Sequence, residues 1–417
     1  RNRFVFLSDE NVITSRAGDF FNLFGKSALT VTADDPIDIT ASSNYASYPT
    51  DCIAINAGLI IFSPFNQFLL TTDNDVFSPA TAKIKDISSY DFNVNSEPFY
   101  LGTNVGFLAT ETSASKLYEM TEVTRDGQPI VVEQSKLVSR SFAANLTRAA
   151  ASKELGLVLF SDGSKTAWGY KYFADGERKL QSAFFKWEFS HDVVDHYVMD
   201  DVYYAVMGDG DTTHLVEINL GEFIQQQDYE QDYSQFKYVD FQQTLTPVLG
   251  PLGGFVTIPY SGDIQVYREG SPINFKQSGT SVIVSGDDPI TVGIPYTGSL
   301  TLPTIFVSKT KGQAAVNEWT GSLVVHRLKF QMGLHGAYNI HIKRKGRDDY
   351  NVLYEATMQD AYPADHSPTA FDIERVVPVY TRNTDMELSI SSDFPTPMTI
   401  YSLQWEGDYN PKYYKNV

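Results

Sequence analysis

The chain has 417 residues, a formal net charge of −19 at pH 7 and a single cysteine, Cys52. One cysteine excludes an intrachain disulfide and a cysteine-based metal site. No apolar run approaches the roughly 20 residues that a membrane-spanning helix needs, so we expect no membrane insertion. The acidic charge argues against a groove that grips nucleic acid, whereas walls that repel phosphate would suit a conduit through which DNA slides.

The first residues, Arg1-Asn-Arg-Phe-Val-Phe-Leu7, read as a strand already under way, without an initiator methionine or a signal-peptide pattern. We therefore expect the chain to be part of a longer polypeptide. The segments 4–7 and 12–15 flank Asp9-Glu-Asn11 and predict a hairpin. The aromatic residues that follow Ala17-Gly18 are expected to fill a core.

Strand patterns dominate the rest of the sequence, since short Val-, Ile-, Phe- and Tyr-rich runs alternate with Gly, Asp, Asn, Ser and Pro clusters. Only the Ala-rich segment 141–154 is compatible with a helix. The clearest stretch, residues 155–189, contains two Asp-Gly turns and predicts a three-stranded meander. Trp168, Tyr170 and Tyr172 then share one face of the middle strand.

A strand–turn–strand unit recurs along the first half. Its copies start at residues 58, 106, 156 and 203, so the spacings are 48, 50 and 47 residues. Spacings of roughly 40 to 50 residues are typical of β-propeller blades, which bury their faces by stacking on one another. An antiparallel β domain with irregular hairpins remains the alternative.

We predict an all-β fold with three segments. Residues 1–224 form β-propeller-like blades, 225–260 form a polar and Gly/Pro-containing connector, and 261–417 form a C-terminal antiparallel sandwich or barrel. Strands of this last domain are expected at 264–267, 282–285, 290–294, 301–307, 323–330, 338–342, 352–356, 376–380, 386–390 and 399–405.

The usual catalytic and cofactor-binding motifs are missing, so no catalytic, cofactor or metal residue is predicted. His191 and His196 are expected to point to different faces of a strand rather than to share a metal. Asp209-Gly-Asp211 is read as a hairpin turn rather than a cation loop. In Asp34-Asp35-Pro36 the carboxylates are expected to accept local backbone N–H bonds. Paired acids for glycoside hydrolysis cannot be tested by sequence spacing.

One basic run stands out, with Lys343, Arg344, Lys345 and Arg347 at a strand end and turn. It is either a solvated loop tip or a docking contact for an acidic neighbour, where charge complementarity would set the register.

Several segments resemble the tail tubular protein B, or tail nozzle, family of short-tailed, podovirus-type bacteriophages. They occur in the same order over nearly the whole chain: residues 6–24, 34–38, 58–62, 67–68, 184–187, 292–296 and 402–407. The resemblance implies a structural protein of the virion tail, assembled in the host cytoplasm. It further implies a propeller-bearing subunit of a sixfold ring that lies beneath the portal-adaptor ring, contacts tail fibres and encloses the DNA exit channel.

Two other functional classes remain open. A glycan-binding or glycan-hydrolysing tail protein would use exposed Tyr and Trp side chains as sugar platforms. A free-standing, ligand-binding β-propeller would not form a ring.

Overall fold

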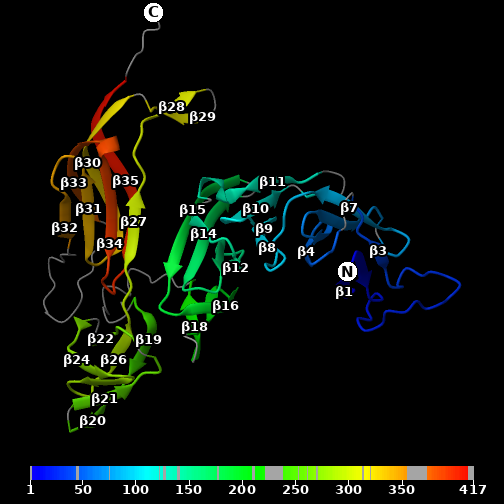
Figure 1. The fold of residues 1–417 in the computed structure, drawn as a ribbon, viewed down its shortest axis with the longest axis horizontal. Coiled ribbons are helices and arrows are strands. Elements are labelled where there is room, and N and C mark those ends of the chain that lie inside the picture. Colours follow the sequence, from blue (N-terminus) through cyan, green and yellow to red (C-terminus); the bar gives the residue numbers. More distant parts are fainter. Residues whose placement is uncertain are drawn as a thin grey trace, which may run out of the picture. The chain divides into compact units, whose positions relative to one another are not determined.

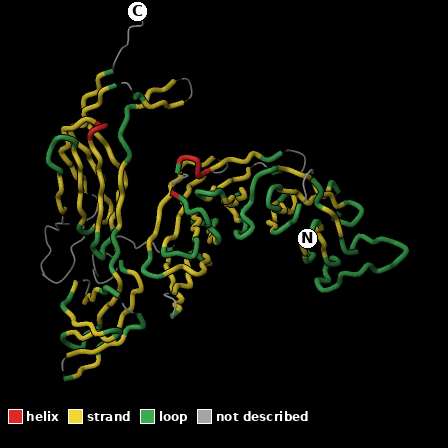
Figure 2. The backbone as a smooth tube through the Cα atoms, viewed as in Figure 1, coloured by secondary structure: helices red, strands yellow, loops and turns green. Residues whose placement is uncertain are grey.

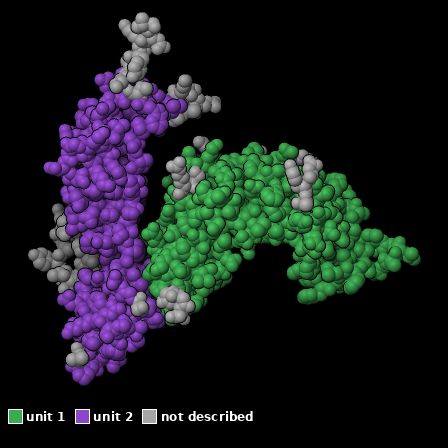
Figure 3. Space-filling view, in the orientation of Figure 1, with its two compact units in different colours: residues 1–222 green, residues 223–417 purple. Residues whose placement is uncertain are grey.

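The computed structural model describes the whole chain except residues 1, 44–46, 75, 122, 125–127, 139–140, 176–177, 209–211, 221–237, 252, 261, 269–270, 312–313, 320, 355–372 and 412–417. Strands make up nearly all of its regular structure, and among the described residues the helical elements η1 (Gln134–Leu137) and η4 (Asn383–Asp385) are single 3₁₀ turns (Figure 2). The predicted all-β class is confirmed. The chain divides into two compact units, residues 1–222 and 223–417 (Figure 3).

The described residues of unit 1 form five antiparallel meanders that follow one another along the chain (Figure 1). The first is β1 (Val5–Ser8), β2 (Asn11–Thr14) and β3 (Asp38–Thr40), and the second is β4 (Asp51–Ile55), β5 (Gly58–Phe62), β6 (Gln67–Thr72) and β7 (Ala82–Ser88). The third is β8 (Phe99–Leu101), β9 (Asn104–Thr110), β10 (Ser115–Thr121) and β11 (Ile130–Glu133). The fourth is β12 (Arg148–Ser152), β13 (Leu157–Ser161), β14 (Thr166–Asp175) and β15 (Arg178–Glu188), and the fifth is β16 (Asp192–Met199), β17 (Val202–Gly208) and β18 (Thr213–Asn219).

Successive sheets of unit 1 pack face to face because alternate residues of a strand point to opposite faces. In β5, Ile61 packs with Val12 of the first sheet, whereas Ile60 and Phe62 pack with Phe107 of the third. The third and fourth sheets share a further core that includes Leu108, Leu117, Phe160 and the predicted trio Trp168, Tyr170 and Tyr172. On the other face of the fourth sheet, the ring of Trp187 lies 5.8 Å from that of Tyr203 in the fifth. Each inner sheet is therefore covered on both faces.

The recurrent unit predicted from the sequence corresponds to one structural position. Its four copies are β5, β9, β13 and β17, each the second strand of its sheet. The predicted hairpin at the N-terminus is β1 and β2. Between β13 and β14, Gly163 has a φ of +86°, a conformation that glycine adopts without penalty. Closure of these sheets into a propeller stays a prediction.

The Ala-rich segment 141–154 does not form a helix. Its last part is strand β12, which pairs with β13, and Ala149 and Ala151 pack against the core between the third and fourth sheets. Burial and ladder hydrogen bonds outweigh the modest helical preference of alanine.

Unit 2 contains two sandwiches in succession. The first packs β19 (Asp240–Leu245), β26 (Ile290–Ile294), β22 (Gln265–Arg268) and β23 (Ser271–Pro272) on β20 (Val248–Gly250), β21 (Gly253–Thr257), β25 (Ser281–Val284) and β24 (Phe275–Ser278). The second packs β27 (Gly298–Leu302), β34 (Met386–Ser392), β31 (Tyr338–Arg344) and β32 (Tyr350–Tyr354) on β33 (Ile373–Arg382), β30 (Ser322–His335) and β35 (Met398–Asn410). A separate hairpin consists of β28 (Ser308–Lys311) and β29 (Ala314–Asn317).

The segment expected as a connector is more structured than its composition suggests. Residues 225–237 lie outside the described part of the chain. Between residues 240 and 257, however, β19, β20 and β21 pair with each other or with later strands such as β25 and β26. Strand partners that arrive about 30 to 50 residues later are invisible in a local pattern.

Candidate functional site

The basic residues predicted as a docking contact form a turn between β31 and β32, called here the basic turn (residues 343–347). Gly346 has a φ of +75° and allows the chain to reverse. Lys343, Lys345 and Arg347 are exposed, and Arg344 is half-buried.

The two arginines are fixed by backbone carbonyl groups. Arg344 donates from Nε and Nη2 to the Asp348 carbonyl at 3.0 and 2.6 Å. Arg347 donates from Nη1 to the Tyr380 carbonyl at 3.0 Å. The Lys345 backbone N–H is bound by the Asp385 carbonyl at 2.9 Å. The turn is thus tied to β33 and η4, and its shape is set before any partner arrives.

The basic turn also lies among acids. His341 is 3.4 Å from Asp349, and Glu387 stands opposite Lys343 in the register of β31 and β34. The ion pairs of this sandwich, as far as it is described, leave out the four basic side chains of the turn. Carbonyl partners do not neutralise a guanidinium, so the turn retains a small positive tip on an acidic chain.

The described histidines are candidate metal ligands by residue type. Within the described residues, no group of three or more His, Cys, Asp or Glu side chains could hold an ion. His196 lies inside the fifth sheet with its Nδ1 3.0 Å from the Tyr203 hydroxyl, and burial lowers its pKa to about 4. Residues 209–211, read from the sequence as a hairpin turn, lie outside the described part.

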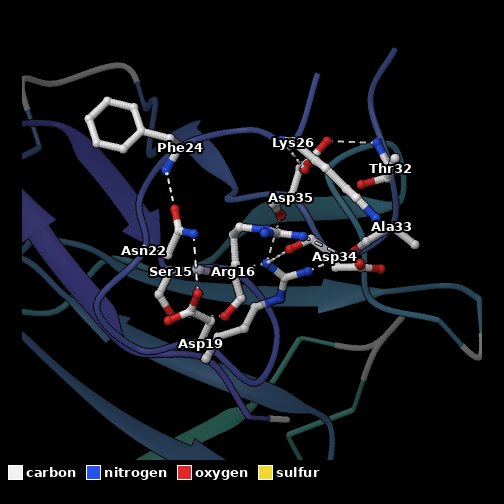
Figure 4. A network of polar contacts seen from close by, with 11 residues as sticks. Ser15, Arg16, Asp19, Asn22, Phe24, Lys26, Thr32, Ala33, Asp34 and Asp35 are labelled. Atoms are coloured by element: carbon white, nitrogen blue, oxygen red, sulfur yellow. Dashed lines mark hydrogen bonds and ion pairs between the residues drawn. The ribbon is translucent and has the colours of Figure 1, made fainter. Parts of the chain in front are cut away.

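The Asp34-Asp35 turn behaves as predicted for one of its two carboxylates (Figure 4). Asp35 accepts the backbone N–H groups of Thr32 and Lys26 at 2.7 and 2.9 Å, and these two bonds lower the pKa of its carboxyl. Asp34 instead lies 3.6 Å from the guanidinium of Arg16.

The expectation that the aromatic residues after Gly18 fill a core is wrong. Phe21 is 98% exposed and Phe24 82% exposed, on a loop that projects from β2 and β3 (Figure 1). Asp35 holds the loop by accepting the backbone N–H groups of Lys26 and Thr32, and the apolar side chains stay outside. Sequence reasoning missed this surface because a run such as Phe20-Phe21-Asn22-Leu23-Phe24 is typical of buried strands.

The glycan-binding alternative requires exposed aromatic side chains on which sugar rings could stack. Trp168 is buried and its Nε1 donates to the Ser141 carbonyl at 2.6 Å, while Trp187 and Trp405 are half-buried. Trp319 is the exposed tryptophan: its side chain is 72% exposed, and its ring lies 4.7 Å from that of Phe306. Tyrosines such as Tyr48, Tyr380 and Tyr401 are exposed as well, so the use of aromatic side chains as sugar platforms stays a prediction.

No helix in the described part of the chain is long and apolar enough to cross a membrane.

Comparison with known proteins points to one family. The model of the family described as bacteriophage nozzle protein matches residues 1–416. The tail tubular protein gp12 of Escherichia phage T7 is 26% identical over 198 residues, which cover 46% of this chain and 25% of that protein. Crystal structures of an exo-β-1,3-galactanase from Phanerochaete chrysosporium align at 10% identity over 90% of this chain and 98% of that one, with a TM-score of 0.26, which is too low to carry an argument. The chain belongs to the bacteriophage nozzle protein family and is a structural protein of the phage tail, and hence of the virion.

Proposed function

We propose that the chain is a subunit of a ring-shaped, hexameric tail nozzle that encloses the DNA exit channel. In this proposal the ring docks to the portal-adaptor ring and to tail fibres, retains DNA in the virion and releases it during ejection. In this role the protein forms the wall of the DNA channel and catalyses no reaction.

The observation that carries the proposal is the stack of sheets in unit 1. Ile60, Phe62 and Phe107 belong to one shared core, and Leu108, Phe160 and Tyr170 belong to the next. Sheets that share cores in this way cannot slide past one another without opening apolar surface to water. A stiff body of this kind suits a channel wall. Sixfold symmetry is taken from the family resemblance.

The charge of the chain supports passage of DNA rather than capture. Six copies of a chain with a net charge of −19 surround a bore with negative potential. Affinity for DNA depends on cations that replace the counterions of phosphate, and an acidic lumen provides few of them. We expect no retention of double-stranded DNA by the assembled ring at about 0.1 M salt.

Electron microscopy of tail particles and native mass spectrometry of the purified chain test the ring. The proposal requires a closed assembly in which this chain surrounds an axial channel. A protein that stays monomeric at high concentration and is absent from tail particles would refute it.

The basic turn is proposed as a contact for an acidic neighbour in the tail. The variant Lys343→Glu/Lys345→Glu reverses the two lysines and leaves both arginine clamps in place. Its expected effect is a loss of adaptor or fibre attachment without loss of the ring. The matched control is Lys136→Glu/Lys276→Glu, which makes the same change in net charge at two other exposed lysines. Equal attachment by both variants removes the basic turn from the proposal.

A further inference from the structure

The loop between β2 and β3 carries an exposed apolar surface, called here the apolar finger (residues 20–31). Its exposed side chains are those of Phe20, Phe21, Leu23, Phe24, Leu29 and Val31. Lys26 is the single charged residue in this stretch of sequence. Monomeric proteins rarely leave so many large apolar side chains together in water, and such patches mark interaction sites.

The finger is held rigidly at its base. The Asp35 carboxylate, itself buried, binds the backbone of Lys26 and Thr32 as described above. Arg3, two residues before β1, donates to the carbonyls of Ser15, Ala33 and Asp35 at 2.8, 2.8 and 2.7 Å. Since this polar network already fixes both ends of the loop, a partner would pay little entropy to order it.

The last sheet of unit 1 offers a second apolar surface. Tyr203, Ala205 and Met207 of β17 are buried, so the alternate residues of the strand point to the outer face. In the register, Tyr204 stands opposite Tyr197 and Val206 opposite Leu215.

On that face the rings of Tyr197 and Tyr204 stack at 5.1 Å, and Leu215 is 70% exposed. This surface, with Met199 at 53% exposure, is called here the outer face of β16–β18. A sheet face of this composition normally packs against something.

We propose that the apolar finger of one copy packs on the outer face of β16–β18 in a second copy, and that repetition of this contact closes the ring. The inference rests on the ring proposed above and names the surfaces that build it. Because the two surfaces differ, the contact is head-to-tail, and head-to-tail contacts generate a closed ring when their rotation closes.

Area and charge favour a second copy as the occupant. At their observed exposures, Phe20, Phe21 and Phe24 alone present roughly 450 Å² of aromatic surface. The leucines and valine of the finger add to it, toward the roughly 800 Å² per partner of a stable interface. Copies with a net charge of −19 repel one another, so they can meet only where charge is sparse. The acids that the register places on the outer face, Asp195 and Glu217, are opposite in sign to Lys26 on the finger.

Two variants test the contact by complementation. Phe21→Ser/Phe24→Ser removes the finger and keeps the outer face, while Leu215→Lys damages the outer face and keeps the finger. Each variant alone should need at least a tenfold higher concentration than the wild type to assemble, measured by sedimentation velocity. An equimolar mixture should form a dimer and stop there, because it contains only one intact pair of surfaces.

Leu137→Ser is the matched control, since Leu137 is 97% exposed on η1, away from both surfaces. It should assemble like the wild type. All variants should keep the wild-type circular dichroism spectrum, because the altered side chains are exposed. Photo-crosslinking from position 21 in mixed ¹⁴N- and ¹⁵N-labelled protein should join different copies at residues 194–217.

The outcomes separate this inference from the proposed function. Rings that form normally from both variants, or crosslinks from position 21 that stay within one copy, overturn the finger contact and leave the nozzle ring standing. A mixture that gives no dimer also overturns it. A wild-type chain that never assembles overturns both.

Discussion

A buried ion pair between the third and fourth sheets of unit 1 provides the sharpest test of how these sheets are held together. Glu119 of β10 has a side chain only 4% exposed, and Lys179 of β15 lies 2.5 Å from its Oε2. Gln134 and Asn104 donate to the same carboxylate at 2.6 and 2.8 Å. Lys179 also donates to the Tyr170 hydroxyl at 2.9 Å.

Replacement of Lys179 by methionine should destabilise unit 1 by about 3 kcal/mol, the lower end for breaking a buried pair, because the lysine itself is 23% exposed. The change removes the cation from beside the buried Glu119 side chain and leaves it with two neutral donors. Glu119→Gln removes the charge and keeps an acceptor oxygen for one of those two donors. The double variant should therefore recover most of the loss, with a coupling energy of about 2 kcal/mol.

Urea unfolding read by hydrogen exchange in β10 and β14 measures the effect on unit 1 separately from unit 2. Lys83→Met is the control, since its pair with Asp73 is exposed on both sides and should contribute less than about 1 kcal/mol. A Lys179→Met protein as stable as the control, or a double variant no better than the single, would show that the pair does not connect the sheets.

Three further outcomes are expected. Acidification from pH 7 to 4 should cost unit 1 about 3 kcal/mol through His196, because its folded pKa is about 4 and the unfolded side chain takes up a proton below about 6.5; thermal melts of His196→Gln should lack this loss. Gly169→Ala should destabilise unit 1 by roughly 1–3 kcal/mol in urea unfolding, since the new Cβ would lie 2.1 Å from the Phe185 ring. Asp35→Asn should speed protease cleavage of the apolar finger severalfold at neutral pH, and the wild-type finger should loosen in the same way only as the pH falls through the lowered pKa of Asp35.

The strands of unit 1 could be predicted because the information for them is local. The Asp-Gly turn at 162–163 favours a positive φ; a continuous apolar run precedes it and a run that alternates with a period of two follows it. The stacking of the sheets could be predicted as well. Copies of one strand pattern are expected to form similar sheets, and each of them buries its faces against the sheets next to it. The meander and the shared face of Trp168, Tyr170 and Tyr172 are confirmed on these grounds.

What could not be predicted depends on partners far away in the sequence. Ala150 belongs to a strand because β13 and a core lie beside it, and no residue of segment 141–154 carries that information. The basic run was located correctly at a turn, but the clamp on Arg347 comes from Tyr380, 33 residues later. The apolar finger shows the opposite outcome. Its apolar run stays exposed because Arg3 and Asp35, which lie outside the run, hold its ends.

Burial along the row of sheets explains why the two ends of unit 1 matter for assembly. Every residue of β6 and β13 is buried, because those strands have a neighbouring sheet on each side. In β1 and β18, burial alternates residue by residue, as expected for sheets covered on one face. Apolar side chains on the outer face of such a sheet, for example Leu215 of β18, have a free-energy cost in water until something covers them. The finger contact proposed above would cover the outer face of β16–β18 in this way, and the same burial of apolar surface that holds the inner sheets together would then hold two copies together.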